Sequence, residues 1–348
     1  MRCCELQGKK DIKVVERAKP DTVAAGNVLV RVERAGICGT DIHYYHEGAN
    51  GAFVVQHPYV IGHEFCGVVD AVGEGVAALS VGDQIAVDPN IICHTCENCR
   101  TGHSSQCMNA RFFGSASTMP HVDGGFQEFL CVRASQCHKV SEPMDPDRLA
   151  FAEPLAVVLH AMSNLPSSLV AKKVFVAGAG PIGALAVAVA KIRGASEIVV
   201  SDISDTALAR AKDVGATLTL NPLRDSEVIA AFGKGKGYFD LVVEASGALP
   251  AVHTCVEVVR AFGHFAQVGV LGKALVEIPY SRLASKEVTF CGSFRNGPEF
   301  GEAVRLLETG QIDPTPLHSH TFKAEQISEA LEVAADKTLA CKVLIDFT

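Results

Sequence analysis

The stretch Lys173–Gly183, KVFVAGAGPIG, decides the fold of this chain. After the lysine comes an apolar run typical of a buried strand, and a glycine-rich turn follows immediately. Residues 184–192 then read as a helix of small side chains that can pack closely against a sheet. Strand, turn and helix together predict a dinucleotide site, with the pyrophosphate at the helix N-terminus. The residues expected to bind the cofactor there are Gly178, Gly180, Pro181, Ile182 and Gly183.

The next predicted strand, Glu197–Ser201, ends at Asp202, nineteen residues after Gly183. A carboxylate at this position is expected to bind the adenosine ribose hydroxyls. It favours NAD⁺ over NADP⁺, because a 2′-phosphate would meet a negative charge. Arg210, one to two helical turns further on, leaves NADP⁺ possible.

The rest of the chain continues the alternation of strands and helices. Further strands are predicted at Thr217–Asn221, Phe239–Ser246, His264–Val270 and Val288–Phe294. Such a rhythm predicts a doubly wound parallel sheet. Two amphipathic helical stretches, Glu299–Thr309 and Ala324–Ala334, and a closing strand, Cys341–Ile345, complete the sequence.

Four of the 13 cysteines lie within fifteen residues, as Cys93, Cys96, Cys99 and Cys107. Four thiolates at this spacing can close tetrahedrally around one Zn²⁺ with no open position, which makes a structural site. An iron–sulfur cluster takes the same ligands and stays open as an alternative. The polar filling of the loop and the lack of a redox-partner motif favour zinc.

Length and composition limit the function classes. At 348 residues the chain is expected to form two domains. With a net charge of −8, the chain lacks the excess of basic residues that is typical of proteins that bind nucleic acid or anionic membranes. The N-terminus lacks the apolar segment of a signal peptide, and the longest apolar run, Ile182–Ala190, is too short to span a bilayer. We therefore expect a cytoplasmic protein without nucleic-acid or membrane partners, whose cysteines stay reduced.

A second constellation lies upstream, in Cys38-Gly39-Thr40-Asp41-Ile42-His43 and Gly62-His63-Glu64. A thiol, an imidazole and a carboxylate can each bind a first-row metal. Taken separately, the two segments are as well explained by a buried structural cysteine and an ordinary surface pair.

Three motifs in order give the chain a family resemblance. They are the segment from Cys38 to His43, the run Gly62-His63-Glu64-x2-Gly67-x5-Gly73-x2-Val76, and the four-cysteine lobe. Together they resemble the zinc-dependent medium-chain alcohol dehydrogenases. The resemblance implies an α/β chain with a discontinuous GroES-like β-rich catalytic domain at 1–152 and 295–348, carrying a structural-zinc lobe at about 90–110. It implies a Rossmann NAD-binding domain at 153–294.

The resemblance also implies a second, catalytic zinc. Its ligands would be Cys38, His63 and Glu153, the last directly or through a water. Glu64 would stand behind the ligands or exchange with Glu153 during turnover. A mixed ligand set keeps one position open for a substrate hydroxyl, and coordination favours the alkoxide that expels hydride to NAD(P).

Two further sets of roles come from the same resemblance. The Thr40 hydroxyl would pass the substrate proton towards His43; the alternative is that both residues only shape their loop. Val268 and Val270 would lie against the nicotinamide.

Within the family, four segments resemble the L-idonate 5-dehydrogenase branch, namely Arg111–Ala116, Pro120–Phe126, Gly237–Asp240 and Gly292–Arg295. The implied reaction is reversible oxidation of L-idonate at C5 to 5-keto-D-gluconate. Arg295 would bind the substrate carboxylate, with Tyr44 and Phe113 lining the pocket.

Two alternatives stay open. Polyol dehydrogenases of the sorbitol and xylitol type carry an arginine in a similar place, so a polyol is the runner-up to a sugar acid. A non-catalytic zinc- and dinucleotide-binding structural protein is the alternative from another class. Relatives are commonly dimers or tetramers, which makes a homo-oligomer the expected assembly.

Overall fold

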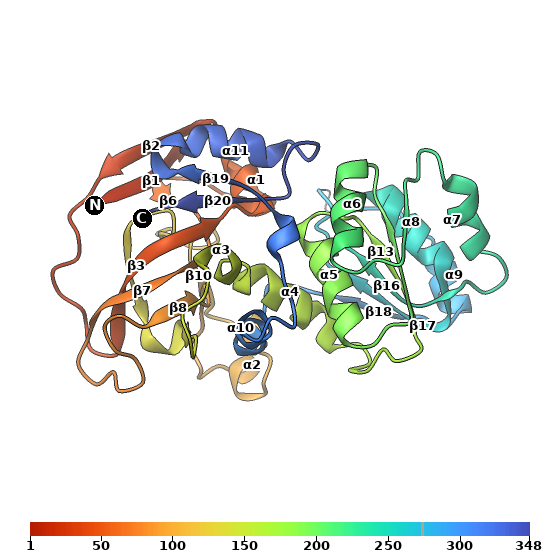
Figure 1. Ribbon diagram of the computed structural model, residues 1–348, viewed down its shortest axis with the longest axis horizontal. Helices are drawn as coiled ribbons and strands as arrows, with labels where there is room; N and C mark the ends of the chain where they lie inside the picture. Colours follow the sequence, from red (N-terminus) through yellow and green to blue (C-terminus); the bar gives the residue numbers. More distant parts are fainter. Residues whose placement is uncertain (273–274) are drawn as a thin grey trace. The chain divides into compact units, whose positions relative to one another are not determined.

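The computed structural model describes residues 1–272 and 275–348, and the chain forms two compact units (Figure 1). The first unit comprises Met1–Glu153, Phe300–Gly310 and His318–Thr348. The second comprises Pro154–Glu299 and Gln311–Leu317. In the described parts of the chain, no helix is long and apolar enough to cross a membrane.

The second unit is built on a six-stranded parallel sheet in the order β15-β14-β13-β16-β17-β18. The strands are β13 (Lys173–Ala177), β14 (Glu197–Ser201), β15 (Leu218–Leu220), β16 (Phe239–Glu244), β17 (Val259–Gln267) and β18 (Thr289–Gly292). The helices in this part of the chain are α4 (Ala152–Ser163), α5 (Pro181–Ile192), α6 (Asp205–Asp213), α7 (Ser226–Phe232), α8 (Leu249–Val258) and α9 (Tyr280–Ser285). The order reverses between β13 and β16, which is where open α/β sheets bind ligands.

The predicted strand His264–Val270 is wrong at both ends. It begins earlier, at Val259, because a shift in register against β16 lets the strand run through the exposed Phe262. It ends at Gln267, because the N–H groups of Val268 and Gly269 both donate to the Glu244 carbonyl and the chain turns there.

The first unit contains a seven-stranded sheet, β12-β8-β7-β3-β20-β19, with β11 also paired to β3, and a three-stranded sheet, β2-β1-β6. Their bounds are β1 (Arg2–Gly8), β2 (Asp11–Glu16), β3 (Asn27–Gly36), β6 (Tyr59–Val60), β7 (Glu64–Val72), β8 (Gln84–Val87), β11 (Phe129–Arg133), β12 (Cys137–Lys139), β19 (His318–Lys323) and β20 (Lys342–Asp346). Short two-stranded pairs are β4 (Ala49–Asn50) with β5 (Phe53–Val54), and β9 (Asn90–Ile91) with β10 (Arg111–Phe112). The helices are α1 (Gly39–Glu47), α2 (Glu97–Arg100), α3 (Pro146–Leu149), α10 (Phe300–Glu308) and α11 (Ile327–Ala335).

The C-terminal strand β20 lies beside β3, so the last residues of the chain pack next to residues 34–36. This pairing brings residues more than 300 positions apart in sequence into one sheet. It sets one side of the candidate metal site described below.

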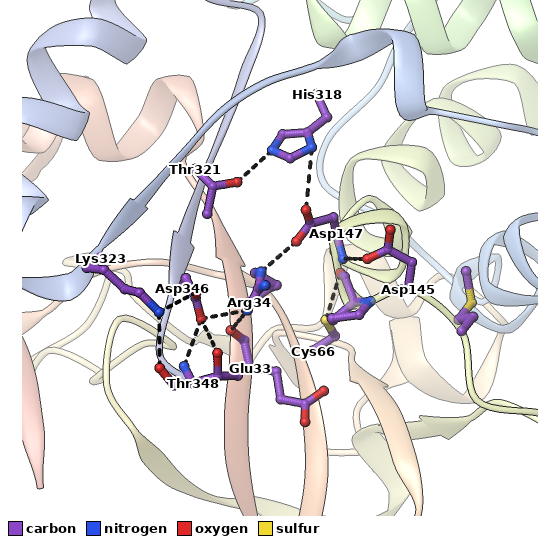
Figure 2. A network of polar contacts seen from close by, with 12 residues as sticks. Glu33, Arg34, Cys66, Asp145, Asp147, His318, Thr321, Lys323, Asp346 and Thr348 are labelled. Carbon is purple, nitrogen blue, oxygen red and sulfur yellow. Dashed lines mark hydrogen bonds and ion pairs between the residues drawn. The ribbon is translucent and has the colours of Figure 1, made fainter.

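A polar network fastens the short helix α3 to the sheet (Figure 2). Arg34 of β3 bonds Asp147 of α3 at 2.5 Å and Asp346 of β20 at 2.6 Å. His318 of β19 lies 3.6 Å from the same Asp147 carboxylate. Because α3 ends four residues before Glu153, the network anchors the segment that leads into this buried carboxyl group.

Candidate active site and metal centres

Cys38 caps the N-terminus of α1 in extended backbone geometry. Its N–H donates to the Asp41 carboxylate at 2.9 Å, and this return bond fixes the loop that presents the thiol. Burial raises the pKa of the Cys38 thiol to about 12, and the nearby Glu64 carboxylate adds to the effect.

His63 reaches the same place from the segment between β6 and β7. Gly62 has a φ of +93°, and a Cβ there would lie 2.2 Å from the Phe126 ring, so only glycine fits this turn. The Asp41 carboxylate accepts the Gly62 N–H at 3.1 Å and lies 3.7 Å from Nδ1 of His63. Asp41 therefore links the thiol loop to the imidazole loop, and it leaves the far nitrogen of the ring for a metal.

Glu64 opens β7 and is 1% exposed. One of its oxygens accepts from Nζ of Lys342 at 2.5 Å, and the same ammonium donates to the Ile37 carbonyl at 3.2 Å. Burial alone would lower the pKa of Lys342, but the Glu64 and Cys38 charges outweigh it and raise it. A Cβ on Gly36 would lie 2.3 Å from that Glu64 oxygen. The Glu64 carboxylate therefore fits in this place only because residue 36 is a glycine.

Glu153 is 5% exposed and lies near the start of α4. Burial raises the pKa of its carboxyl group to about 8; His63 lowers it in part, and Glu64 and Cys38 add to the rise. These electrostatic effects come from the same side chains that surround the thiol of Cys38.

The ligand atoms of Cys38, His63 and Glu64 all lie within 4.8 Å of one another. Burial raises the pKa of the Cys38 thiol and of the Glu153 carboxyl group, which favours their neutral forms. The Lys342 ammonium is the positive charge near both groups. A divalent cation fits the group of Cys38, His63 and Glu64, because it would let the thiol regain its charge and would bind the imidazole and a carboxylate beside it. Glu153 is not one of the three residues whose ligand atoms are brought this close together, and its role as a ligand stays a prediction.

Thr40 and His43 both belong to α1, three residues apart. Thr40 is partly exposed and accepts from the Asn50 amide at 3.3 Å. His43 is exposed and pairs with Glu47 at 3.1 Å. The proton relay through these two residues stays a prediction.

The three predicted substrate contacts occur in different settings. Tyr44 is fully buried, and its hydroxyl accepts the Ala116 N–H at 3.2 Å. Phe113 is 6% exposed and packs edge-on against Phe65. Arg295, in the second unit, has a φ of +58° and lies over the Phe294 ring. Their roles in substrate binding remain predictions.

The four-cysteine lobe closes on itself. The sulfur atoms of Cys93, Cys96, Cys99 and Cys107 all lie within 4.8 Å of one another. The Asn109 amide lowers the pKa of Cys93 to about 5, helped by backbone N–H groups, whereas burial raises that of Cys99 to about 12. Four mutually close sulfur atoms with no other ligand type fit a closed structural zinc site.

The glycine-rich turn of the second unit has the geometry that a dinucleotide needs. Gly178 has a φ of +97°, and a Cβ on Gly183 would lie 1.8 Å from the Gly178 carbonyl oxygen. Gly180 caps α5, and Pro181 takes its first position. The turn thus presents its backbone at the start of a helix, where phosphate oxygens bind.

The remaining predicted cofactor residues lie at the carboxyl edge of the same sheet. Asp202 follows β14, and its two oxygens accept the N–H groups of Ala179 at 2.7 Å and Ser204 at 2.8 Å. Val268 is partly buried and Val270 is 83% exposed in the loop after β17. Cofactor contacts at these three positions remain predictions.

Sequence reasoning missed two charged residues of the candidate zinc site, Asp41 and Lys342. In the sequence, Asp41 stands out only as part of the Cys38 motif, and nothing there predicts that it is 0% exposed. Lys342 carried a usable signal, because it is the charged residue of the predicted apolar strand Cys341–Ile345.

Two family models match the chain. One, described as the alcohol dehydrogenase GroES-like domain, matches residues 24–142, and one described as zinc-binding dehydrogenase matches residues 181–309. Among curated proteins, L-idonate 5-dehydrogenase (NAD(P)(+)) of Escherichia coli (strain K12) is 42% identical over 99% of this chain and 98% of its own length. A probable D-xylulose reductase A of Neosartorya fischeri is 36% identical over 95% of this chain and 93% of its own.

Among solved structures, the crystal structure of L-idonate 5-dehydrogenase from Escherichia coli matches with a TM-score of 0.94 at 41% identity, covering 99% of this chain and 97% of that one. These matches confirm the resemblance and the fold class predicted from the sequence. The chain therefore belongs to the zinc-dependent medium-chain alcohol dehydrogenase family of NAD(P)-linked oxidoreductases.

Proposed function

We propose that this enzyme catalyses the reversible oxidation of L-idonate at C5 to 5-keto-D-gluconate, with NAD⁺ or NADP⁺ as the hydride acceptor. The observation that supports a dehydrogenase centre most directly is the cluster of Cys38, His63 and Glu64, whose ligand atoms lie within 4.8 Å of one another. The choice of substrate is supported by the 42% identity to an L-idonate 5-dehydrogenase over 99% of the chain.

The proposed ligands of the catalytic zinc are Cys38, His63 and Glu153, with Glu64 able to exchange with Glu153. A zinc ion in this position supplies a Lewis acid that lowers the pKa of a coordinated hydroxyl group. Cys93, Cys96, Cys99 and Cys107 would hold a second, structural zinc. In this proposal, residues 1–152 and 295–348, together with Glu153 at the boundary, bind metal and substrate, and the rest of residues 153–294 binds the dinucleotide.

The chain's own residues have the remaining tasks. Asp41 holds the loops of the thiol and the imidazole in one arrangement through its bonds to the Cys38 and Gly62 N–H groups. Lys342 balances the buried Glu64 charge. Thr40 accepts the substrate hydroxyl proton and passes it towards solvent at His43, while the C5 hydride leaves for the nicotinamide.

The substrate carboxylate needs a cation, and Arg295 is the proposed partner. Tyr44 and Phe113 complete the proposed substrate set. Asp202 is the proposed ribose contact, which makes NAD⁺ the preferred cofactor, with NADP⁺ as the weaker one.

A polyol dehydrogenase is the second candidate function, supported by the 36% identity to a probable D-xylulose reductase. The test measures NADH formation with L-idonate, D-gluconate, sorbitol and xylitol in parallel, with and without a chelator. We expect turnover to be fastest with L-idonate and to be lost with the chelator. Faster turnover of sorbitol or xylitol would favour the polyol function, and no turnover of any alcohol by zinc-loaded protein would favour a structural role.

We also propose that the enzyme is a cytoplasmic dimer or tetramer, as is common in the family. Light scattering on the purified protein tests the assembly. A mass equal to one chain at micromolar concentration would contradict it.

A further inference from the structure

Glu244, the last residue of β16, has a fully buried carboxylate. One oxygen accepts the N–H groups of Ser246 at 2.8 Å and Gly247 at 3.1 Å, together with the Ser246 hydroxyl at 2.5 Å. The other accepts the Gln267 amide at 2.5 Å. In all of these bonds the carboxylate is the acceptor, which is the pattern of its ionised form.

The partners of this carboxylate differ from those of the acid at the other end of the same strand. Asp240, at the second position of β16, bonds Arg260 at 2.9 Å and lies 3.6 Å from Lys172. The groups that bond Glu244 are amides and a hydroxyl, which are neutral. These bonds therefore solvate the Glu244 charge without cancelling it.

The carboxylate holds two loops in place. Ser246 and Gly247 belong to the loop after β16, and Gln267 ends β17. The Gln267 amide also donates to the Gly269 carbonyl at 2.7 Å, and a Cβ on Gly269 would lie 2.5 Å from the Glu244 carboxylate. One buried anion thus sets the geometry of both loops at the carboxyl edge of the sheet.

These loops adjoin the glycine-rich turn. Strand β16 is paired with β13 at the point where the strand order reverses. The Ala245 N–H donates to the Ala177 carbonyl at 2.8 Å, and a Cβ on Gly178 would lie 2.8 Å from the Ser246 nitrogen. A dinucleotide bound at this switch point would therefore lie over the loop that Glu244 holds.

The direction of the cofactor follows from the proposed function, on which this inference rests. Asp202 follows β14, on one side of β13, and would bind the adenosine ribose. The pyrophosphate would bind at the start of α5, directly after β13. The nicotinamide half would then extend to the opposite side, over β16 and β17.

We propose that Glu244 is a positioning residue of the dinucleotide site that also discriminates between the two redox forms of the cofactor. Its carboxylate fixes the loops beneath the nicotinamide, and its negative charge favours the oxidised ring, which is positively charged, over the reduced ring, which is neutral. Two charges several ångströms apart in a partly buried site interact strongly enough to change the dissociation constant of the cofactor several-fold.

The test measures dissociation constants of NAD⁺ and NADH for the full chain carrying Glu244→Gln, by titration calorimetry. We expect NAD⁺ binding to weaken about fivefold and NADH binding to change less than twofold. The matched control is Asp240→Asn, because it removes the same charge from the same strand about 13 Å away. It should leave the ratio of the two constants unchanged.

A second variant separates charge from geometry. In Glu244→Gln/Gln267→Glu the carboxylate moves to the other side of the same hydrogen bond, so the ratio should return towards the wild-type value. An unchanged ratio in Glu244→Gln, or an equal change in Asp240→Asn, would overturn the inference while leaving the proposed function intact. Failure of the wild-type protein to bind either dinucleotide would contradict the proposed function itself.

Discussion

The two clusters of metal-binding side chains in the first unit are built in opposite ways. The four-cysteine lobe comes from fifteen consecutive residues, 93–107, and three of its thiols are partly exposed. The other cluster brings together Cys38 and the buried His63 and Glu64, and it draws on Lys342 from the last strand of the sheet. The first closes a loop on itself, whereas the second depends on the whole fold of the unit.

The difference shows how each cluster can serve a different purpose. Four thiolates supply every ligand of a tetrahedral zinc, so nothing remains for a substrate. A thiol, an imidazole and carboxylates in a buried setting leave a position open and place charges where burial makes them strong. We expect loss of a metal ligand from the buried cluster to affect turnover, and loss of a metal ligand from the lobe to affect stability.

The largest expected effect comes from His63→Ala. Loss of one zinc ligand should lower kcat at least about a thousandfold, because Lewis-acid activation of the hydroxyl is worth several kcal/mol. The melting temperature should change little. Steady-state kinetics and thermal unfolding measure both quantities, and a variant that keeps a tenth of wild-type kcat would contradict the assignment.

Lys342→Met is the next largest change. The side chains of Lys342 and Glu64 are 4% and 2% exposed, so removing the ammonium leaves a buried carboxylate without its ion-pair partner. We expect a loss of about 3–5 kcal/mol in the free energy of unfolding. In the control Glu64→Gln/Lys342→Met, most of the loss should be regained, because no charge is then left unpaired. Denaturant unfolding checks both variants, and equal losses in the two would show that the ion pair is not the cause.

Cys99→Ser should have a smaller effect than Lys342→Met on stability, and in contrast to His63→Ala it should lower stability rather than turnover. Without a fourth thiolate the lobe should lose its zinc, and the melting temperature should fall by about 5 °C. Turnover measured well below that temperature should stay within a few-fold of wild type. If Cys99→Ser and His63→Ala were to lower stability equally, the two clusters would not have separate roles.

The smallest expected effect concerns the pH dependence of zinc binding. Burial raises the pKa of Glu153 to about 8 and of Cys38 to about 12, so both groups are protonated at pH 7 in metal-free protein. Zinc must displace these protons, and its affinity for the buried cluster should rise with pH and fall as the pH drops from 8 to 6. Competition with a coloured chelator should give a slope of about two protons per zinc. The slope should be about one in Glu153→Gln, and an unchanged slope would remove Glu153 from the ligand set.

Sequence alone predicted those parts of the molecule whose partners are neighbours in the chain. The cysteine spacing from Cys93 to Cys107 brings four thiols together without help from other elements. The turn between β13 and α5 is local in part, since Gly183 is fixed by the Gly178 carbonyl five residues before it. Local geometry of this kind can be predicted from residue type and spacing alone.

Long-range contacts between residues outside the recognised motifs were beyond sequence reasoning. Lys342 meets Glu64 across 278 positions, through the pairing of β20 with β3 and of β3 with β7. Gln267 meets Glu244 across 23 positions in a neighbouring strand. In both cases strand register decides which polar side chains meet, and register depends on the packing of the whole sheet.

Zinc-edge anomalous diffraction from crystals of the wild-type protein is the most direct test of the two zinc sites. We expect two peaks in each chain, one among the four sulfur atoms of the lobe at about 2.3 Å from each. The other should lie between the Cys38 sulfur, a His63 nitrogen and a carboxylate oxygen of Glu153 or Glu64. A single peak in the lobe, with no density beside Cys38 and His63 in zinc-replete crystals, would contradict this expectation.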